Sequence, residues 1–434
     1  MERRKFIKNT LLTAGGIMAA PYILPSGRLF AGTGTRRVNH VVLALYAGGV
    51  RNLESVHQND GNLMPYMLSG NNPIKSDIRG GIQSLESYDL SLGYNLQSRG
   101  TLFKEFRYKE GPTGHFNGHT VAVTGNYTNT GLNLRAHPQS PTIFELYRKH
   151  NGADTSALNS WWIADQLGSY PFLEYSEHPD YGPLYGANYI APKSLVSNGF
   201  QALGNPVNFT TSQEENIARI QNFVNGAFGK SAGEVGFAND PANRKQVKEF
   251  YFDLINKTSS NQYTYPLPQN LMNGDMRTMF YATEVLKTFQ PELMCVNITN
   301  VDIAHSDYTA YANNMHRADY AIAHLWKTIQ ETPGMKDDTI MIVVPEHGRN
   351  KEPNNIRDAY GRYALDHTSD ASSRELFCLM IGPQNKEVVK YNNTINQVMG
   401  ESIDVVPTIS DILGFMPDIP GGLLPGRVLN EAFV

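Results

Sequence analysis

The chain of 434 residues is long enough for one large domain with an insertion or for two domains, and it can bury a sizeable core. Its 37 basic and 41 acidic residues give a formal net charge of -4, which excludes the basic excess that nucleic-acid binding requires. With 38 Gly, 24 Pro and 23 Tyr beside only 18% charged residues, the composition favours a compact, loop-rich extracytoplasmic enzyme over a disordered or coiled-coil chain.

The N-terminus has the features of an export signal. Arg3 and Arg4 precede a moderately apolar segment, Leu11 to Leu24, and residues 29–31 form a small-residue cleavage site. The paired arginines indicate a twin-arginine signal over residues 1–31, which predicts a location in the periplasm or cell envelope. The alternative is a membrane helix, but glycines and a proline interrupt a segment too short to span a bilayer. No membrane span is therefore expected in the mature chain.

The first half of the mature chain predicts a buried strand followed by helices. Val38 to Tyr46 is an apolar run of strand length. Residues 52–114 are expected to be mostly loop, with one or two helical pieces. The stretch from Gly114 to Gly125 predicts a helix with two histidines, at 115 and 119, near its N-terminus, where free N–H groups favour an anionic substrate group. Pro141 to His150 predicts an amphipathic helix, and residues 161–164 a short strand.

The second half predicts a helical segment and then alternating strands and helices. Residues 204–290 carry apolar residues at helical spacing and are expected to form a helical insertion or cap. Strands are expected at 293–298, 339–344 and 376–381, with a helix at 315–329. This order indicates parallel crossovers, so residues 36–434 are predicted to form one α/β domain with a mostly parallel central sheet and helices on both faces. Cys295 and Cys378 are expected to be buried thiols, with a disulfide as the open alternative.

Three pairs of a carboxylate and a histidine follow or flank the predicted strands: Asp302 with His305, Glu346 with His347, and Asp366 with His367. In open α/β sheets ligands bind beyond the carboxyl ends of the strands, so these pairs stand where chemistry is usually done. Carboxylate oxygen together with imidazole nitrogen suits Zn, Mn or Fe better than Ca or Mg, and five or six such ligands are enough for two metal ions. A single histidine is more often an ordinary surface or core residue, and His316 is interpreted in that way. The recurrence of the pair favours a divalent metal site, with Zn as one candidate.

Short motifs resemble the alkaline phosphatase superfamily, in its sulfatase-like and phosphodiesterase-like branches. The C-terminal run from Asp404 to Gly414 resembles the Asp-x-x-Pro-Thr-x-x-x-x-Leu-Gly end of sulfatases and their relatives. The sequence Glu346-His347-Gly348 resembles the Asp-His-Gly of the superfamily. The segment from His119 to Gly125 is similar to the His-x-x-x-x-Thr-Gly segment that follows the nucleophile in the phosphodiesterase branch.

The resemblance implies a set of metal ligands. Asp302, His305 and His367 would bind one metal ion, and Glu346 and His347 a second, so that the two ions clamp the attacking and leaving oxygens of a phosphate or sulfate ester. The chain departs from the superfamily pattern at the first strand, where Ala47 or Gly48 stands in place of a ligand Asp. The spacing from Asp302 to His305 is also one residue shorter than in the phosphodiesterase branch.

The nucleophile position is a further departure. His115 stands where a Thr or Ser is expected, the Cys/Ser-x-Pro-x-Arg motif of sulfatases does not occur, and Thr113 lies two residues away. One hypothesis is therefore a metal-dependent hydrolase of small anionic esters, in which His115, His119 or a metal-bound water attacks and Arg51 or Arg349 steadies the anion. The alternative hypothesis is a catalytically inactive relative that serves as a binding or structural protein at the envelope. The sequence leaves the oligomeric state open.

Overall fold

The computed structural model describes residues 34–434 except 86–87, 89, 130–136, 153–155, 165–172, 191–238, 261, 263–266, 269–270, 369 and 384. The expected twin-arginine signal at 1–31 lies outside these residues. The expected insertion at 204–290 stays a prediction, because residues 204–238 also lie outside. None of the described helices combines the length and the apolar character needed to cross a membrane.

Among the described residues, eight strands form one sheet in the order β4-β3-β5-β1-β6-β7-β2-β8. The strands are β1 (His40–Tyr46), β2 (Gly100–Arg107), β3 (Ser160–Ile163), β4 (Asn188–Ile190), β5 (Leu293–Ile298), β6 (Thr339–Pro345), β7 (Glu375–Ile381) and β8 (Asn393–Glu401). Strands β4, β3, β5, β1 and β6 pair in parallel, and β2 pairs in parallel with β8. The predicted α/β class with a mostly parallel sheet is confirmed.

Strand β7 corrects the expectation of parallel crossovers throughout. It runs antiparallel to both β6 and β2. The connection from β6 to β7 contains no α-helix in its described part, so it returns the chain without the crossover helix that a parallel pair needs. As a consequence β2 runs in the same direction as β6, and the carboxyl ends of β1, β2, β5 and β6 meet at one edge of the sheet.

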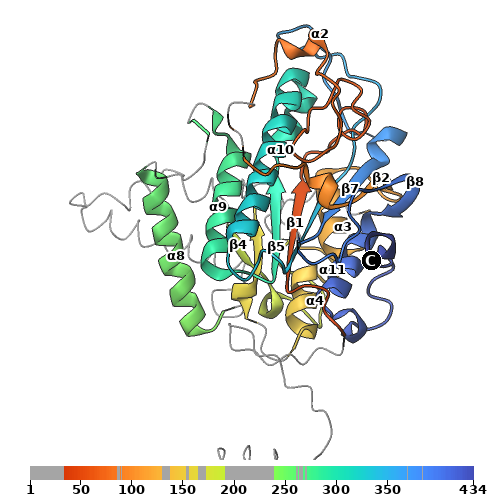
Figure 1. The fold of residues 1–434 in the computed structure, drawn as a ribbon. Coiled ribbons are helices and arrows are strands. Elements are labelled where there is room, and N and C mark those ends of the chain that lie inside the picture. Colours follow the sequence, from red (N-terminus) through yellow and green to blue (C-terminus); the bar gives the residue numbers. More distant parts are fainter. Residues whose placement is uncertain are drawn as a thin grey trace, which may run out of the picture.

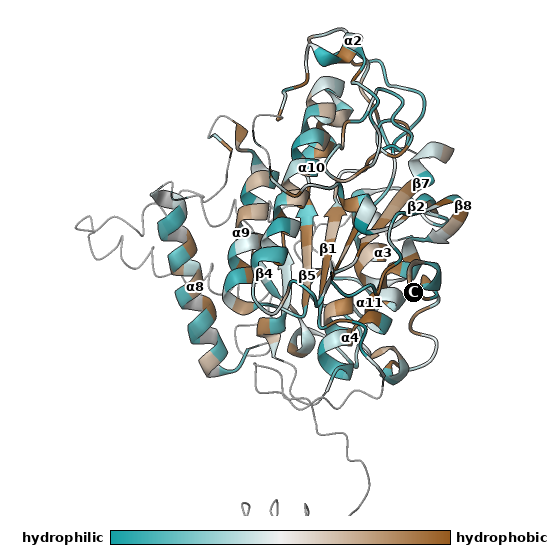
Figure 2. Ribbon diagram, in the orientation of Figure 1, coloured by the Kyte–Doolittle hydropathy of each residue, from teal (hydrophilic) through white to brown (hydrophobic). Residues whose placement is uncertain are grey.

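Helices cover both faces of the sheet (Figure 1). The described α-helices are α2 (Ser76–Arg79), α3 (His115–Thr124), α4 (Ile143–His150), α8 (Pro241–Ser259), α9 (Gly274–Phe289), α10 (Tyr308–Glu331) and α11 (Val405–Ile412), of which α2 lies beyond the sheet. On β1, Val42 and Ala44 belong to the core cluster that includes α9 and α10, while Val41 and Leu43 belong to the one that includes α3, α4 and α11. Because successive side chains of a strand point to opposite faces, β1 is apolar on both. Figure 2 shows the apolar central strands among helices with polar outer surfaces.

Local sequence signals explain where the helices begin and how they pack. Helix α4 starts at a capping box in which the Thr142 side chain accepts from the amide of Glu145 while the Glu145 carboxylate accepts from the amide of Thr142. Helix α10 has 24 residues, most of them buried, and the side chain of Asp307 caps its N-terminus. Helix α9 packs against β5, β3 and α10, so it is part of the layer that covers the sheet. Cys295 and Cys378 are free, buried thiols, as the simpler of the two expectations predicted.

Candidate metal centre

The candidate site lies at the edge of the sheet where β1, β5 and β6 end. Beyond β5, the 3-10 turn Asn300–His305 carries Asp302 and His305. Directly after β6 stand Glu346 and His347. The loop that leads on to β7 contributes Arg349 and, further along, residues 366 and 367. The three carboxylate–histidine pairs of the sequence therefore converge at this edge.

Helix α3 brings His115 and His119 to the same place. The two residues are four apart and so lie on one face of the helix, one turn from each other. Gly118 allows the close approach, because a Cβ at this position would lie 2.9 Å from both the Cβ and the carbonyl oxygen of Glu346. A larger residue at 118 would push α3 away from the end of β6.

Two sets of side chains have the composition and proximity of metal ligands. The first ligand group is His115, Asp302, His305 and His367, and the second ligand group is His115, Glu346 and His347; within each group one ligand atom per residue lies within 4.8 Å of the others. In the first group, Asp302 Oδ1 is 3.2 Å from His115 Nε2 and 3.3 Å from His305 Nε2. In the second, Glu346 Oε1 is 2.7 Å from His115 Nδ1 and 3.2 Å from His347 Nε2.

The three histidines of the first ligand group share one orientation. Each places Nδ1 at hydrogen-bond distance from an oxygen: His115 from Glu346 Oε1 at 2.7 Å, His305 from Asp366 Oδ1 at 2.7 Å, and His367 from the Thr113 carbonyl at 2.6 Å. An oxygen acceptor favours a proton on Nδ1, so Nε2 is the nitrogen that remains to bind a metal ion. This second layer of contacts is what orients metal-binding histidines in proteins.

The first ligand group is partly open, and its electrostatics suit a cation. The side chains of Asp302, His305 and His115 are 41%, 37% and 20% exposed. Burial alone would raise the pKa of Asp302, but the contacts with His115 and His305 hold it well below its usual range, so the carboxylate stays charged. Burial and the neighbouring cationic groups lower the pKa of His367 to about 2, which keeps its imidazole neutral.

The second ligand group is closed. The side chains of Glu346 and His347 are 0% exposed, and His119 Nδ1 forms an ion pair with Glu346 Oε2. Burial would raise the pKa of Glu346, but His119, His347 and His115 outweigh it and hold this pKa far below its ordinary value. The Glu346 carboxylate is therefore charged, and imidazoles surround it.

Arg349 lies beside Asp302 and is fully buried. Its Nη2 donates to Asp302 Oδ1 at 2.8 Å and to the carbonyl of Gly48, its Nε to the Gly49 carbonyl at 3.1 Å, and its Nη1 to the Leu365 carbonyl at 2.9 Å. A Cβ at Gly48 would lie 2.7 Å from the Asp302 amide nitrogen, and one at Gly49 would lie 2.3 Å from His347 Nδ1. The end of β1 thus offers carbonyls to Arg349 and has no room for a side chain.

Thr113 lies against His367 and forms two hydrogen bonds with it. Its hydroxyl donates to the His367 carbonyl at 2.5 Å, and its own carbonyl faces His367 Nδ1. The residue is 5% exposed. Three other residues that the sequence singled out each contact a member of a ligand group. Thr113 contacts His367, His119 contacts Glu346, and Arg349 contacts Asp302. Asp366, which the sequence analysis paired with His367 without giving it a role, proves to bind His305; only the proximity of the two segments in space reveals this.

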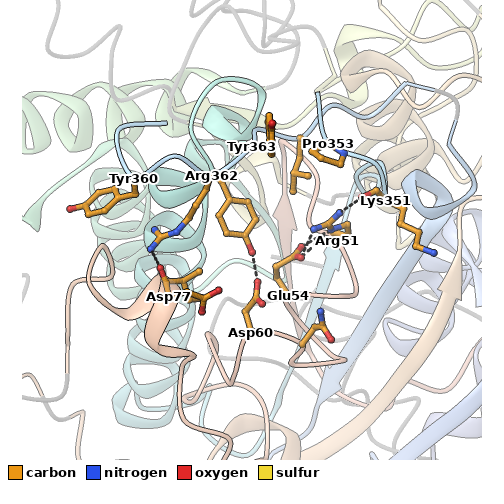
Figure 3. Close-up of a pocket in the computed structure, with 13 residues that line it drawn as sticks. Arg51, Glu54, Asp60, Asp77, Lys351, Pro353, Tyr360, Arg362 and Tyr363 are labelled. Atoms are coloured by element: carbon orange, nitrogen blue, oxygen red, sulfur yellow. Dashed lines mark hydrogen bonds and ion pairs between the residues drawn. The ribbon is translucent and has the colours of Figure 1, made fainter. Parts of the chain in front are cut away.

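A polar cavity of about 420 Å³ is lined by residues that are close in sequence to the site, although none of the ligand residues lines it (Figure 3). Its lining comes from segments that also build the centre. Arg51, Tyr308 and Lys351 line the cavity, and each stands two or three residues after a residue of the site, namely Gly49, His305 and Arg349. Arg51 forms a buried ion pair with Glu54 at 2.5 Å, and Tyr308 bonds to Asp60. The lining holds three cationic and three carboxylate side chains together with three tyrosines, so its charges balance: Arg51, Lys351, Arg362, Glu54, Asp60, Asp77, Tyr308, Tyr360 and Tyr363.

No protein-family model matches the sequence, and the comparison with curated proteins finds no match. Solved structures are similar in fold. One is a protein in the alkaline phosphatase superfamily from Vibrio parahaemolyticus, with 13% identity, coverage of 100% of this chain and 80% of that one, and a TM-score of 0.45. The PsFucS1 sulfatase from Pseudoalteromonas sp. has 10% identity, covers 91% and 71%, and gives a TM-score of 0.47.

A mutant of the alkaline phosphatase PafA has 11% identity, with 93% of this chain and 100% of that one covered and a TM-score of 0.47. These structures are of the superfamily that the sequence motifs resemble. At such identities and TM-scores the likeness is one of fold, and the activity has to be argued from the site.

Proposed function

We propose that the protein is a metal-dependent hydrolase of phosphate or sulfate esters. The observation that carries the proposal is the shared orientation of His115, His305 and His367, whose Nδ1 atoms all face oxygen acceptors. A purely structural cluster of histidines has no need for three imidazoles that are held in one orientation beside one carboxylate. Imidazole nitrogens with one carboxylate oxygen are the donor set of Zn and related divalent ions, so the residues present fit such an ion.

A divalent cation in the first ligand group would act as a Lewis acid toward an ester oxygen and lower the pKa of water. The chain supplies the geometry around it. Asp302, His115, His305 and His367 would bind the cation, and Asp366 and Glu346 hold the rings of His305 and His115. Arg349 fixes the Asp302 carboxylate. The partial exposure of the first group leaves a side from which an ester can enter.

In the proposed reaction, the oxygen of water forms a bond to phosphorus or sulfur while the bond to the alcohol oxygen breaks. The proton that water loses ends on the departing alcohol. Thr113 is not assigned as the nucleophile, because its hydroxyl is committed to the His367 carbonyl. His119 is assigned a positioning role against Glu346, since it is 1% exposed and out of reach of a substrate.

The polar cavity is the proposed place for the alcohol part of the ester. Its balanced charges disfavour a strongly charged group, and its tyrosines and paired polar groups suit an uncharged polar one. The twin-arginine signal that the sequence leads us to expect would place the protein in the periplasm or cell envelope, where such a substrate would be met. Fractionation of cells with and without an intact Arg3-Arg4 pair tests this location, since the proposal expects export to depend on both arginines.

The proposed activity is tested with the full chain, purified and loaded in turn with Zn²⁺ and Mn²⁺. The expected result is turnover of aryl phosphate, phosphodiester or aryl sulfate that a chelator abolishes and added metal restores. Protein that binds no divalent transition metal, and whose stability a chelator leaves unchanged, would contradict the enzyme hypothesis and favour the non-catalytic one.

A further inference from the structure

The two ligand groups differ in whether a substrate can reach them. The first ligand group has partly exposed side chains, whereas the side chains of Glu346 and His347 in the second are 0% exposed. A catalytic metal keeps one coordination position open for water or substrate. Only the first ligand group offers such a position.

His115 belongs to both groups, but its two nitrogens face different partners. Nε2 lies toward Asp302 and Nδ1 toward Glu346. A neutral imidazole has one N–H and one lone pair. If Nδ1 donates to Glu346 and Nε2 binds a cation, both nitrogens are used, and the second group loses one of its three ligands. Glu346 then acts on His115 as Asp366 acts on His305, by holding the ring.

Arg349 provides a fixed positive charge at the same place. Its guanidinium bridges the Asp302 carboxylate and the carbonyls at the end of β1. A carboxylate ligand cannot enter from Gly48 or Gly49, because a Cβ at either position would collide with Asp302 or His347. The positive charge next to Asp302 on this side of the site is therefore supplied by the Arg349 guanidinium.

The charges of the site balance with one divalent ion. Asp302, Glu346 and Asp366 supply three negative charges, and Arg349 supplies one positive charge. One divalent cation brings the sum of these four charges to zero, whereas two would leave an excess of two positive charges, and the second ion would lie in the closed second ligand group. Burying unpaired charge is costly, so the second ion is disfavoured.

We infer that the centre holds a single divalent cation, bound by the first ligand group, and that the Arg349 guanidinium stands in for a second one. This inference rests on the proposed function, because it assumes that the first ligand group binds metal. It changes the role of Glu346 and His347, which the sequence analysis assigned to a second metal ion.

The first test uses the full wild-type chain, stripped of metal and titrated with Co²⁺, whose visible absorption reports binding to nitrogen ligands. The inference expects the absorption to saturate at one equivalent, and metal analysis after dialysis to give one ion per chain. Saturation at two equivalents would overturn the single-cation inference and leave the proposed hydrolase standing. Absence of any binding would overturn both.

Variants then locate the ion. His367→Ala is expected to lose the bound Co²⁺, and Glu346→Gln to retain one equivalent with an affinity about 10- to 100-fold weaker, as for a residue that orients a ligand. A Glu346→Gln protein that binds no Co²⁺ while its circular dichroism stays that of the wild type would show that Glu346 is itself a ligand, against the inference.

A charge-matched pair tests Arg349. Arg349→Met removes the positive charge and is expected to bind a second equivalent of Co²⁺ at least tenfold more tightly than the wild type does. Arg349→Lys keeps the charge and is expected to stay at one equivalent. Equal behaviour of the two folded variants would contradict the role given to Arg349. If Arg349→Met fails to fold, the wild-type count and the Glu346→Gln result still decide the question.

Discussion

The carboxyl groups of Glu346 and Glu174 are equally inaccessible, with 1% and 0% of each residue exposed, yet their surroundings favour opposite protonation states. Three histidines surround Glu346 and hold its pKa far below the ordinary value against the effect of burial. Glu174 has no hydrogen bond to its side chain from another described residue, and burial, with nearby Glu145, raises its pKa well above the ordinary value.

The difference shows what a buried carboxylate needs in order to serve a metal centre. Glu145, beside Glu174, is held by the amides of Thr142 and Gly182 and the hydroxyl of Ser176. Those contacts cap α4 and order a loop, but they supply no nitrogen lone pair. At the candidate metal centre each carboxylate faces at least one imidazole instead. Function is therefore expected at Glu346 and its neighbours, and only structure at Glu145 and Glu174.

The largest expected effect is that of removing a ligand. His367→Ala should lower kcat/KM by more than about 100-fold, because even residues that only orient ligands cost about 10- to 100-fold. The matched control is His316→Ala, a buried histidine whose Nδ1 also faces a carbonyl, that of Leu63, at 3.0 Å. The control should lose stability and keep its metal. A His367→Ala enzyme with wild-type turnover would remove the first ligand group from the mechanism.

A smaller loss is expected at Asp366, which holds His305. Asp366→Asn should weaken metal affinity by about 10- to 100-fold, because the amide no longer favours the tautomer that leaves Nε2 free. The measurement is competition for Zn²⁺ with a chromogenic chelator. Asp370→Asn serves as the control, since Asp370 accepts from the amides of Lys351 and Ser372 and lies outside the ligand groups. Equal affinities for the two variants would argue against an orienting role.

Stability should distinguish the metal centre from the region of Glu174. Glu346→Gln breaks buried ion pairs and should lower the free energy of unfolding of the metal-free protein by about 3–5 kcal/mol. Urea unfolding at pH 8 measures the effect. A neutral or stabilising result would mean that the three histidines do not hold Glu346 as a charged group.

Glu174→Gln should have the opposite effect. The folded-state pKa of Glu174 is raised above its unfolded value. At pH 8 folding therefore costs the free energy of protonating or burying the carboxylate, and a neutral amide removes that cost. The expected gain is about 1–3 kcal/mol at pH 8. It should vanish near pH 4, where the carboxyl is protonated in both states. A gain that is the same at pH 4 and pH 8 would contradict the assignment.

The smallest expected effect concerns the cavity. Tyr360→Ala should raise KM by about 3- to 10-fold for esters with a large polar alcohol and leave methyl esters unchanged, because one aromatic contact is worth about 0.5–1.5 kcal/mol. Phe252 on α8, which is 63% exposed, provides a control in Phe252→Ala. Equal changes for large and small esters would place the alcohol elsewhere.

Much of the fold could be predicted because its central strands are apolar on both faces. Residues 293–298 and 339–344 were identified in this way, as was the helix at 315–329. The expected loop at 52–114 was wrong in one part, since β2 lies there. Strands β2 and β8 were not predicted because both mix polar and apolar residues. Strand β8 is the edge strand and is partly exposed, whereas β2 lies inside the sheet and is mostly buried in spite of its charged residues. The reversed direction of β7 follows from its connection, which no local pattern records.

The candidate site was predictable in position and less so in detail. Polar residues that follow buried strands mark the edge where ligands bind, so Asp302, His305 and His367 could be named from the sequence. The contact of Asp366 with His305, and that of Thr113 with His367, depend on how distant loops meet. The sequence likewise shows Arg349 as a cation near the site. Only its four hydrogen-bond acceptors in the structure show that its guanidinium binds groups of the protein itself.

Anomalous X-ray scattering from crystals of the full chain grown with Zn²⁺ tests the central claim most directly. The account predicts one strong peak at the zinc edge, within coordination distance of Asp302, His305, His367 and His115 Nε2, with Glu346 outside that distance. A peak bound to Glu346 and His347 instead, or the absence of a peak from this edge of the sheet, would contradict it.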